Sequence, residues 1–330
     1  MEKIKLGIIG CGLAAKELHL PALMNLKDKF EIIALCNHTE PKAKELSDML
    51  GGGIPIYLDY KKILNNKDIE AVDIALPIHL NYRVTKNTLA KGKNVIVEKP
   101  IAGNLSEAKK MLNFPLKYGK VMMVAENFRY RAVFNKVKNI IENDTIGKPY
   151  SAVWNIYFNI PVESKYAATE WRQHHQYPGG FMTDAGVHNI AALRLLFGEI
   201  LSVNAFTTSI NPAIGIPDTM SLQFNTKNIF GVYNLFFSVN GLWENKLLIF
   251  GDQGTIEVNE NNIRIKRVDK DDEVIDANDD SGYYLEFTDF YNAVRKGNKV
   301  ISNFYEGYKD LEVIMSALKS ANNGKKILLR

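Results

Sequence analysis

Two segments of the sequence carry side chains whose types and spacing suit proton transfer to or from a hydroxyl group. Lys99 lies two residues after Val97, at the carboxyl end of the predicted strand 94–97. Asp184 and His188 stand four residues apart at the start of a segment with helical spacing, which puts both on one helical face. A desolvated lysine and a histidine can each exchange a proton near neutral pH, and an aspartate can orient or polarise them. We therefore interpret Lys99, His188 and Asp184 as candidate catalytic residues.

Each of these residues, taken alone, has a simpler explanation. A lysine before a proline is most often solvated surface, and a single histidine on a helix most often fills the core or caps the helix. The catalytic interpretation therefore depends on the other motifs of the chain.

A glycine-rich turn connects the first apolar run of the chain to a segment with helical spacing. Gly10, Gly12 and Ala15 form the pattern GxGxxA. In such a turn the first glycine permits a tight bend, the second lets backbone N–H groups approach a pyrophosphate, and the small third residue lets helix and strand pack closely. The strand–turn–helix context predicts a dinucleotide site in which Gly10, Gly12, Leu13 and Ala14 contact the cofactor.

Asn37 and His38 follow the second apolar run, Phe30–Cys36, where an acidic residue often binds the adenosine ribose. An asparagine accepts a ribose hydroxyl but lacks the charge that repels a 2′-phosphate, and His38, Thr39 and Lys42 favour that phosphate. Asn37 is alternatively a simple turn residue. The choice between NAD and NADP stays open.

The order of the predicted elements divides the chain into two parts. Short apolar runs alternate with helical segments from residue 4 to 125, which predicts βαβ units and a parallel sheet. From Tyr150 onward longer alternating runs predict an antiparallel sheet, with a helix at 183–197 and two more helices near the end. The fold class is therefore α/β: an N-terminal Rossmann-type, doubly wound parallel sheet and a C-terminal α+β domain with a large, mostly antiparallel, open-faced sheet.

Composition and charge exclude several classes of protein. The 330 residues are 46% hydrophobic and 24% charged with a formal net charge of only +4, so we expect two globular domains and no nucleic-acid partner. The two cysteines form no CxxC pair, and His174 and His175 have no other metal ligands near them in the sequence, so no metal is predicted. The first residues lack the pattern of a signal peptide, and no stretch of about 18 apolar residues predicts a membrane span. We therefore expect a cytoplasmic protein without a membrane partner.

Several motifs occur in an order that resembles the Gfo/Idh/MocA family, named for glucose–fructose oxidoreductase, inositol dehydrogenase and a rhizopine catabolism protein. Besides the glycine turn, these motifs are Glu98-Lys99-Pro100 preceded by Ala90-Lys91-Gly92-Lys93, Trp171-Arg172, Gly179-Gly180, and Asp184-Ala185-Gly186-Val187-His188. The resemblance implies that Lys99 and His188 face the substrate carbon, with Lys99 hydrogen-bonded to its oxygen and Pro100 at a sharp, cis-like bend. It also implies self-association, as a homodimer or homotetramer, through the exposed sheet face. We expect a dinucleotide-binding domain at 1–126 and a substrate-binding and oligomerisation domain at 127–330; whether the C-terminal helices pack back on the first domain stays open.

Five further residues are expected near the cofactor. Glu98 and Pro77 resemble family positions that flank the nicotinamide ring, and His79 is expected at a helix start beside the cofactor cleft. Asn127, after the sixth strand, either hydrogen-bonds substrate or cofactor or caps the strand end. Arg172 either binds the ribose or an acidic substrate group, or pairs with the aspartate of the catalytic group.

The residues and the resemblance together predict an NAD(P)-dependent oxidoreductase. It would move a hydride between nicotinamide and a hydroxyl-bearing carbon of a sugar, cyclitol or related polyhydroxylated compound, with Lys99 and His188 in proton transfer. His188 is followed by Asn189-Ile190-Ala191, so the sequence here reads His-Asn-Ile-Ala where many family members have His-Asp-x-Asp. Two alternatives stay open: a non-catalytic, nucleotide-sensing regulator on the same fold, and a glycosidase that uses NAD transiently. The substrate and the physiological direction are not determined by the sequence.

Overall fold

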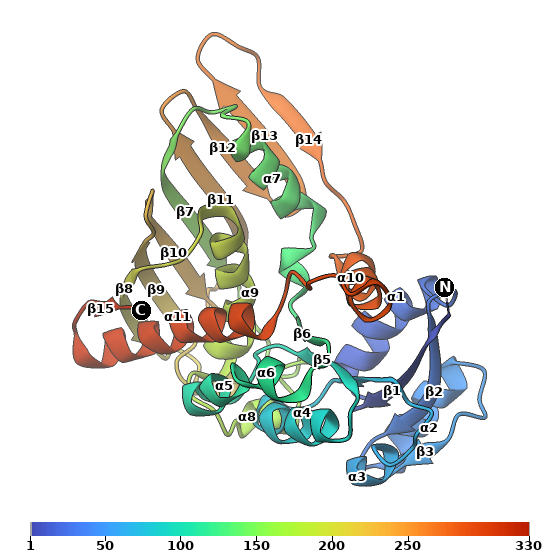
Figure 1. Cartoon of the computed structure of the whole chain (residues 1–330). Coiled ribbons are helices and arrows are strands. Elements are labelled where there is room, and N and C mark those ends of the chain that lie inside the picture. Colours follow the sequence, from blue (N-terminus) through green and yellow to red (C-terminus); the bar gives the residue numbers. More distant parts are fainter. Residues whose placement is uncertain (1, 330) are drawn as a thin grey trace. The chain divides into compact units, whose positions relative to one another are not determined.

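The chain forms two compact units (Figure 1). The computed structural model describes residues 2–329. The first unit combines residues up to 127 with 282–308, and the second combines 128–281 with 309 onward. The boundary lies one residue from the expected division after 126, but the segment 282–308 belongs to the first unit rather than with the rest of 127–330.

Helix α10 (Tyr283–Lys296) explains why the segment 282–308 joins the first unit. Phe287 on this helix is fully buried and packs edge-on against Phe30, with 6.0 Å between the ring centroids. Near the end of the helix, Arg295 donates two hydrogen bonds to the carboxylate of Glu70, at 2.8 and 3.0 Å. Apolar burial and a charge-assisted pair therefore fix the same helix. The residues that it contacts, Phe30 and Glu70, are far from it in sequence.

The first unit is built on a parallel sheet of six strands in the order β3-β2-β1-β4-β5-β6. Its strands are β1 (Ile4–Ile9), β2 (Phe30–Cys36), β3 (Ile56–Tyr57), β4 (Ala71–Ile74), β5 (Asn94–Glu98) and β6 (Met122–Ala125). Successive strands run outward from β1 in one direction and from β4 in the other, so right-handed crossovers put their helices on opposite faces. The order reverses between β1 and β4, which is where such sheets bind ligands at the carboxyl ends of their strands.

The helices of the first unit include one segment that is broken in two. They are η1 (Ala14–His19, a π-helical turn), α1 (Leu20–Asn25), α2 (Glu40–Met49), α3 (Tyr60–Ile63), η2 (Ile78–Leu80), α4 (Asn81–Ala90), α5 (Leu105–Met111), α6 (Phe114–Tyr118) and α10. Two short helices occupy residues 105–118, since α5 ends at Met111 and α6 begins at Phe114. Pro115 explains the break, because its ring cannot donate a backbone hydrogen bond and would clash with the carbonyl of Met111 four residues earlier.

The second unit is built on a sheet of nine strands in the order β14-β13-β12-β11-β7-β10-β9-β8-β15. Every neighbouring pair is antiparallel except β10 with β7, which is parallel. The strands are β7 (Pro149–Tyr157), β8 (Ser202–Thr208), β9 (Thr219–Asn225), β10 (Phe230–Phe236), β11 (Glu244–Gly251), β12 (Gly254–Asn259), β13 (Asn262–Arg267), β14 (Glu273–Asp276) and β15 (Ile327–Leu328). The mostly antiparallel sheet confirms the expected α/β fold class with a second α+β domain.

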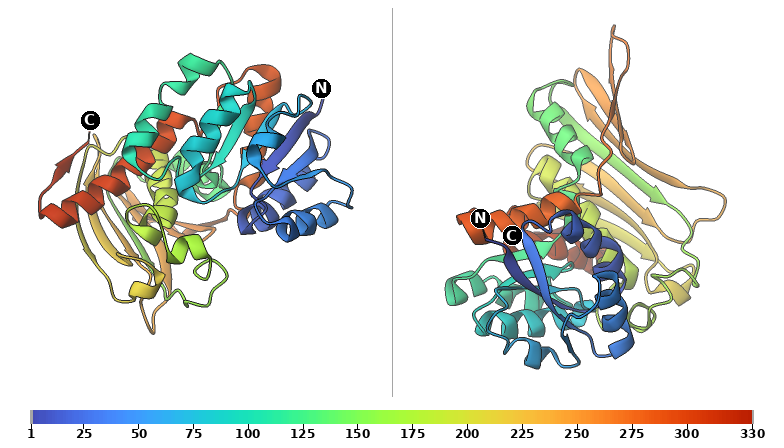
Figure 2. Two further views of the ribbon diagram at one scale, coloured as in Figure 1. Left: turned by 90° about the horizontal axis from the view of Figure 1, so that it is seen from below. Right: turned by 90° about the vertical axis from the view of Figure 1, so that its right-hand side faces the viewer.

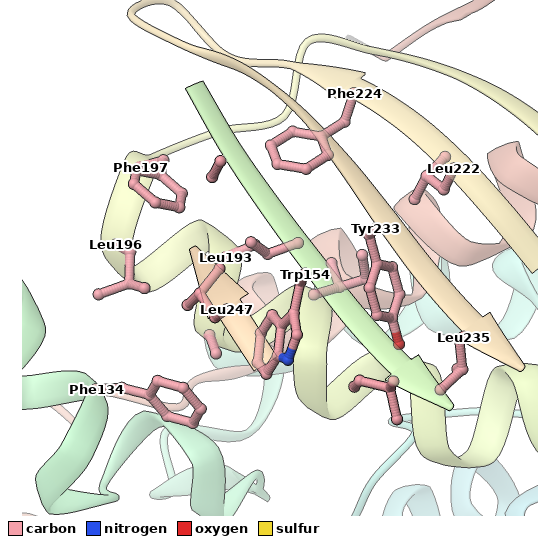
Figure 3. Packing of buried hydrophobic residues seen from close by; sticks show 14 of the residues in the cluster. Phe134, Trp154, Leu193, Leu196, Phe197, Leu222, Phe224, Tyr233, Leu235 and Leu247 are labelled. Carbon is pink, nitrogen blue, oxygen red and sulfur yellow. The ribbon is translucent and has the colours of Figure 1, made fainter. Parts of the chain in front are cut away.

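Helices cover one face of this sheet and create the core of the second unit. They are α7 (Ala132–Glu142), α9 (Gly180–Phe197), η4 (Pro212–Ile214) and the greater part of α11 (Phe304–Asn323). The short η3 (Asn127–Arg129) precedes α7, and α8 (Glu170–Gln173) has no buried residue. Figure 3 shows Trp154 between the two layers, with Phe134 of α7 on one side and Tyr233 of β10 on the other. Their ring centroids lie 5.6 and 6.1 Å from that of Trp154.

The opposite face of the nine-stranded sheet carries no helix of the described chain (Figure 2). Side chains on this outer face alternate along each strand with the buried ones, as in β10, where Gly231, Tyr233 and Leu235 are buried and the residues between them are not. The expected open-faced sheet is therefore present.

Within residues 2–329, no helix combines the length and apolar character needed to span a bilayer.

Candidate active site

The glycine turn after β1 has the geometry that a dinucleotide pyrophosphate requires. Gly10 has φ +101°, and a Cβ at this position would lie 2.1 Å from the carbonyl oxygen of Ala75, so only glycine fits. A Cβ at Gly12 would meet no atom within 4 Å, which leaves open space above the backbone. Leu13 and Ala14, both half-buried, stand where the helical segment η1 begins. A tight bend, an open cradle and a helix start in this order fit a bound pyrophosphate.

Asn37 supports this turn from the end of β2. Its Oδ1 accepts the backbone N–H of Cys11 at 3.2 Å, and its Nδ2 donates to the carbonyl and hydroxyl oxygens of Thr39 at 2.9 and 2.8 Å. The side chain is buried, whereas His38 beside it is exposed. Asn37 therefore does act as a turn residue, and it joins that turn to the glycine loop; contacts of Asn37 and His38 with a cofactor stay predictions.

Lys99 lies on a turn that its neighbours hold at the carboxyl end of β5. The Lys99–Pro100 peptide bond is cis, as the sequence resemblance implied. The backbone N–H of Lys99 donates to Glu98 Oε2 at 3.0 Å. Asn81, fully buried, donates from Nδ2 to the carbonyl oxygens of Glu98 at 2.8 Å and Pro100 at 2.9 Å. The half-buried Lys99 side chain thus starts from a backbone that three hydrogen bonds fix.

Pro77 and His79 lie on the same edge of the sheet, after β4. Pro77 precedes η2, and His79 is half-buried within it. The loop after the Lys99 turn passes close by, since a Cβ at Gly103 would lie 3.3 Å from His79 Cα. Burial, followed by the charge of Arg83, lowers the pKa of His79, so its imidazole is neutral at pH 7 and offers a hydrogen bond without a charge. The predicted cofactor residues of β1, β4 and β5 are thus gathered at one edge.

Sequence reasoning missed a histidine and an aspartate beneath this edge. His19, fully buried, lies between Asp73 of β4 and Glu98 of β5, at 2.8 and 3.0 Å. The sequence does contain one signal, because Asp73 is a charged residue inside the apolar strand Ala71–Ile74. No local pattern links it to His19.

In the second unit the structure pairs Asp184 with Arg172. Arg172 Nε donates to Asp184 Oδ2 at 2.7 Å, and the aspartate is buried at the start of α9. Of the roles left open for Arg172, pairing with this aspartate is therefore present. His188, one turn further along α9, is half-buried and stacks on Phe128 with 4.7 Å between ring centroids. Asn189 faces the core, where its Oδ1 accepts the hydroxyl of Tyr233 at 2.8 Å.

Two further expectations concern Asn127 and metals. Asn127 is buried at the start of η3, just after β6, and its contact with substrate or cofactor stays a prediction. Across residues 2–329, no group of three or more histidine, cysteine, aspartate and glutamate side chains is placed to hold a metal ion.

The parallel sheet with its glycine turn, followed by a mostly antiparallel α+β unit, defines a two-domain protein with a dinucleotide-binding Rossmann domain. Residues 4–126 match the family described as "Oxidoreductase family, NAD-binding Rossmann fold", and residues 134–257 match the "GFO/IDH/MocA C-terminal domain". The chain belongs to the GFO/IDH/MocA family of NAD-binding oxidoreductases, as its motifs indicated.

Two known relatives match nearly the whole chain, and a third matches a large part of it. An uncharacterised protein of Saccharomyces cerevisiae is 31% identical over 91% of this chain and 90% of its own length. The crystal structure of an oxidoreductase of Thermotoga maritima superimposes with a TM-score of 0.93 at 35% identity, covering 99% of this chain and 98% of that one. A D-apiose dehydrogenase of Rhizobium rhizogenes is 26% identical over 79% of this chain and 74% of its own length.

A more distant structure shares the fold. The WlbA dehydrogenase of Bordetella pertussis, solved with NADH and UDP-GlcNAcA, superimposes with a TM-score of 0.88 at 24% identity, over 100% of this chain and 98% of that one.

Proposed function

We propose that this protein is an NAD(P)-dependent dehydrogenase or reductase that acts on a CH–OH group of a sugar, cyclitol or related polyhydroxylated compound. The observation that carries the proposal is the Lys99 turn, which Glu98 and Asn81 hold on the same sheet edge as the glycine turn. A lysine held at the carboxyl edge of a dinucleotide-binding sheet is placed to serve a substrate beside the cofactor. A relative that is a D-apiose dehydrogenase supports a sugar as substrate.

The chain's own residues would bind and orient the substrate and move one proton. The nicotinamide, when bound, supplies the hydride acceptor or donor. Lys99 Nζ would hydrogen-bond the reacting oxygen, and Lys99 or His188 would take its proton as an alcohol is oxidised. Asp184 holds Arg172 at 2.7 Å, so that this buried carboxylate is neutralised before substrate arrives.

The residues after β2 accommodate either nicotinamide cofactor. Asn37 has no charge to repel a 2′-phosphate, and both hydrogens of its amide group are engaged with Thr39. His38 is exposed beside it. We therefore expect NAD to bind, and we expect NADP to bind with comparable rather than strongly reduced affinity.

The outer face of the nine-stranded sheet would join copies of the chain into a homodimer or homotetramer. Phe206 and Phe230 stand on this face and are 73% and 63% exposed. A flat sheet face with exposed aromatic side chains is a typical self-association surface.

We also propose that the protein is located in the cytoplasm.

A cofactor-linked substrate screen tests the proposed function. Purified protein is mixed with NAD⁺ or NADP⁺ and a panel of pentoses, hexoses, anhydrosugars and cyclitols, and reduced nicotinamide is followed by absorbance. Wild type should form reduced cofactor with at least one compound. Saturable NADH binding without turnover of any compound would favour the regulator, and glycoside cleavage without net reduction would favour transient use of NAD.

A further inference from the structure

The first unit contains a buried charged cluster of which the proposed function involves only Glu98. His19 ends the π-helical turn η1, Asp73 lies in β4, and Glu98 ends β5. His19 Nδ1 is 2.8 Å from Asp73 Oδ2, and Nε2 is 3.0 Å from Glu98 Oε1. His19 and Asp73 are fully buried, and Glu98 is nearly so. A π-helical turn shifts the helix register by one residue and is frequent at functional sites.

Hydrogen-bond chemistry specifies the charge on His19. Ionised carboxylates only accept hydrogen bonds, so two carboxylate partners require both ring nitrogens to donate, which is the imidazolium form. Burial alone would lower the pKa of His19, but the charges and hydrogen bonds of Asp73 and Glu98 outweigh it and raise that pKa well above its usual value. The aromatic neighbours from α10, Phe287 and Tyr283, contribute no charge, with ring centroids 5.2 and 6.3 Å from that of His19.

Helix α10 adds a further carboxyl group, Glu286, to the surroundings of the cluster. Glu286 is fully buried, and neither carboxylate oxygen has a hydrogen-bond partner within the described part of the chain. Burial raises its pKa well above the usual value; His19 opposes this, while Glu98, Glu126 and Asp73 add to it. Burial therefore favours the neutral form of Glu286, while the ring nitrogens of His19 hydrogen-bond to Asp73 and Glu98.

The cluster connects directly to the Lys99 turn. Glu98 uses Oε1 for His19 and Oε2 for the backbone N–H of Lys99. One carboxylate therefore links a buried imidazolium to the backbone from which the lysine side chain starts.

We propose that His19 is a positioning residue: as an imidazolium between Asp73 and Glu98, it fixes Glu98 against Lys99 and balances the carboxylate charge that the Lys99 amine would otherwise feel. This proposal rests on the function proposed above, in which Lys99 exchanges a proton with substrate. Without the imidazolium, the unbalanced Glu98 charge would stabilise the ammonium form of Lys99 and leave fewer molecules able to accept a proton.

The first test is made on the wild-type protein by NMR with ¹⁵N-labelled histidine. At pH 8, where free imidazole is neutral, one of the six histidines should show two protonated ring nitrogens, and this signal should be absent from His19→Gln. If that variant does not fold, single substitutions of the other five histidines assign the signal by elimination. A His19 ring with one protonated nitrogen at pH 8 overturns the proposal.

The second test measures the reactivity of the Lys99 amine without any substrate. Only the neutral amine reacts with trace acetic anhydride, and peptide mass spectrometry gives the labelling rate at pH 8. In His19→Gln, Lys99 should be labelled several-fold to about tenfold more slowly than in wild type. A tenfold slower rate corresponds to a pKa of the Lys99 amine that is higher by about one pH unit. Adding Glu98→Gln to His19→Gln should restore the rate to within about twofold of wild type, because the carboxylate that contacts the Lys99 backbone is then replaced by a neutral amide.

A matched control separates positioning from loss of stability. Glu70→Gln breaks the charge pair with Arg295 at the opposite, amino-terminal edge of the same sheet. It should lower the melting temperature while leaving Lys99 labelling within about twofold of wild type. Equal labelling of Lys99 in folded His19→Gln and wild type overturns the proposal. Neither test needs a turnover measurement, so failure of the substrate screen is distinguishable from failure here.

Discussion

A buried carboxyl group in the first unit makes the folding stability depend on pH. Glu286 is buried without a hydrogen-bond partner in residues 2–329, and burial raises its pKa. Between the pKa of an exposed glutamate and this raised pKa, the unfolded chain loses a proton that the folded chain keeps. Folding stability contributed by this group therefore falls as pH rises through that window, by about 1.4 kcal/mol per pH unit.

Glu286→Gln should remove this pH dependence, because glutamine resembles the protonated acid in shape and stays neutral. The variant should match wild type near pH 4 and become progressively more stable than wild type as pH rises above about 4.5, an exposed glutamate's usual range. Urea unfolding across pH 4–8, measured as the free energy of unfolding, checks this. A difference between variant and wild type that is constant over that range would contradict the assignment.

Lys99 is the residue on which catalysis is proposed to depend. Lys99→Met should lower kcat by about 10³-fold, because it removes the proposed proton-transfer and hydrogen-bonding group while keeping an unbranched side chain only one atom shorter. NADH affinity should stay within about twofold of wild type, since the glycine turn is untouched. Steady-state kinetics and NADH fluorescence titration measure the two quantities. Undiminished turnover would remove Lys99 from the mechanism.

At the scale of elements, the two glycines of the turn after β1 have different structural roles. Gly10 is required by the fold, since its φ is +101° and a Cβ there would meet the Ala75 carbonyl at 2.1 Å. Gly12 is not required by the fold, since a Cβ there meets nothing within 4 Å. The two glycines of one motif therefore serve different purposes.

Alanine substitutions should separate these purposes. Gly10→Ala should destabilise the protein by more than 2 kcal/mol (about 1–3 kcal/mol for the backbone strain alone) because the clash adds to that strain. Gly12→Ala should fold with a melting temperature close to that of wild type but bind NADH at least about tenfold more weakly, because its methyl group fills space that the pyrophosphate needs. Thermal unfolding and NADH titration check both variants. Normal NADH affinity in Gly12→Ala would place the cofactor elsewhere.

At the scale of the whole molecule, the nine-stranded sheet leaves one broad face without helices. On it, Asn234 donates from Nδ2 to Asn155 Oδ1 at 2.9 Å and accepts from the Ser221 hydroxyl at 2.7 Å, so a polar ladder crosses three strands. Phe206 and Phe230 flank this ladder on β8 and β10. Satisfied polar groups beside exposed aromatic rings are the composition of a specific protein interface.

Charged residues on this face should therefore dissociate the protein. Phe206→Glu combined with Phe230→Glu should lower the mass measured by analytical ultracentrifugation to that of one chain at micromolar concentration. Val268→Glu is the matched control, because Val268 is 81% exposed but lies in the turn after β13 rather than on a strand. A wild-type protein that stays monomeric at all concentrations would contradict self-association.

Local sequence patterns predicted some elements better than others. The glycine turn, the strand Phe30–Cys36 and the fold class were correct because periodicity and turn chemistry are local signals. Helix α7 (Ala132–Glu142) was not expected, although Val133, Phe134 and Val137 have helical spacing and are buried. Strands β13 and β14 were also missed, because alternation of charged and apolar residues on a half-exposed hairpin gives a weak signal.

The sequence by itself determined where the cofactor turn lies, which lysine follows the fifth strand, and to which family the chain belongs. Only the tertiary structure brought together His19, Asp73 and Glu98, because these partners are 54 and 79 residues apart along the chain. Charge balance in a buried cluster depends on which strands and helices become neighbours. That is a property of the packed sheet, and no local spacing of residues encodes it.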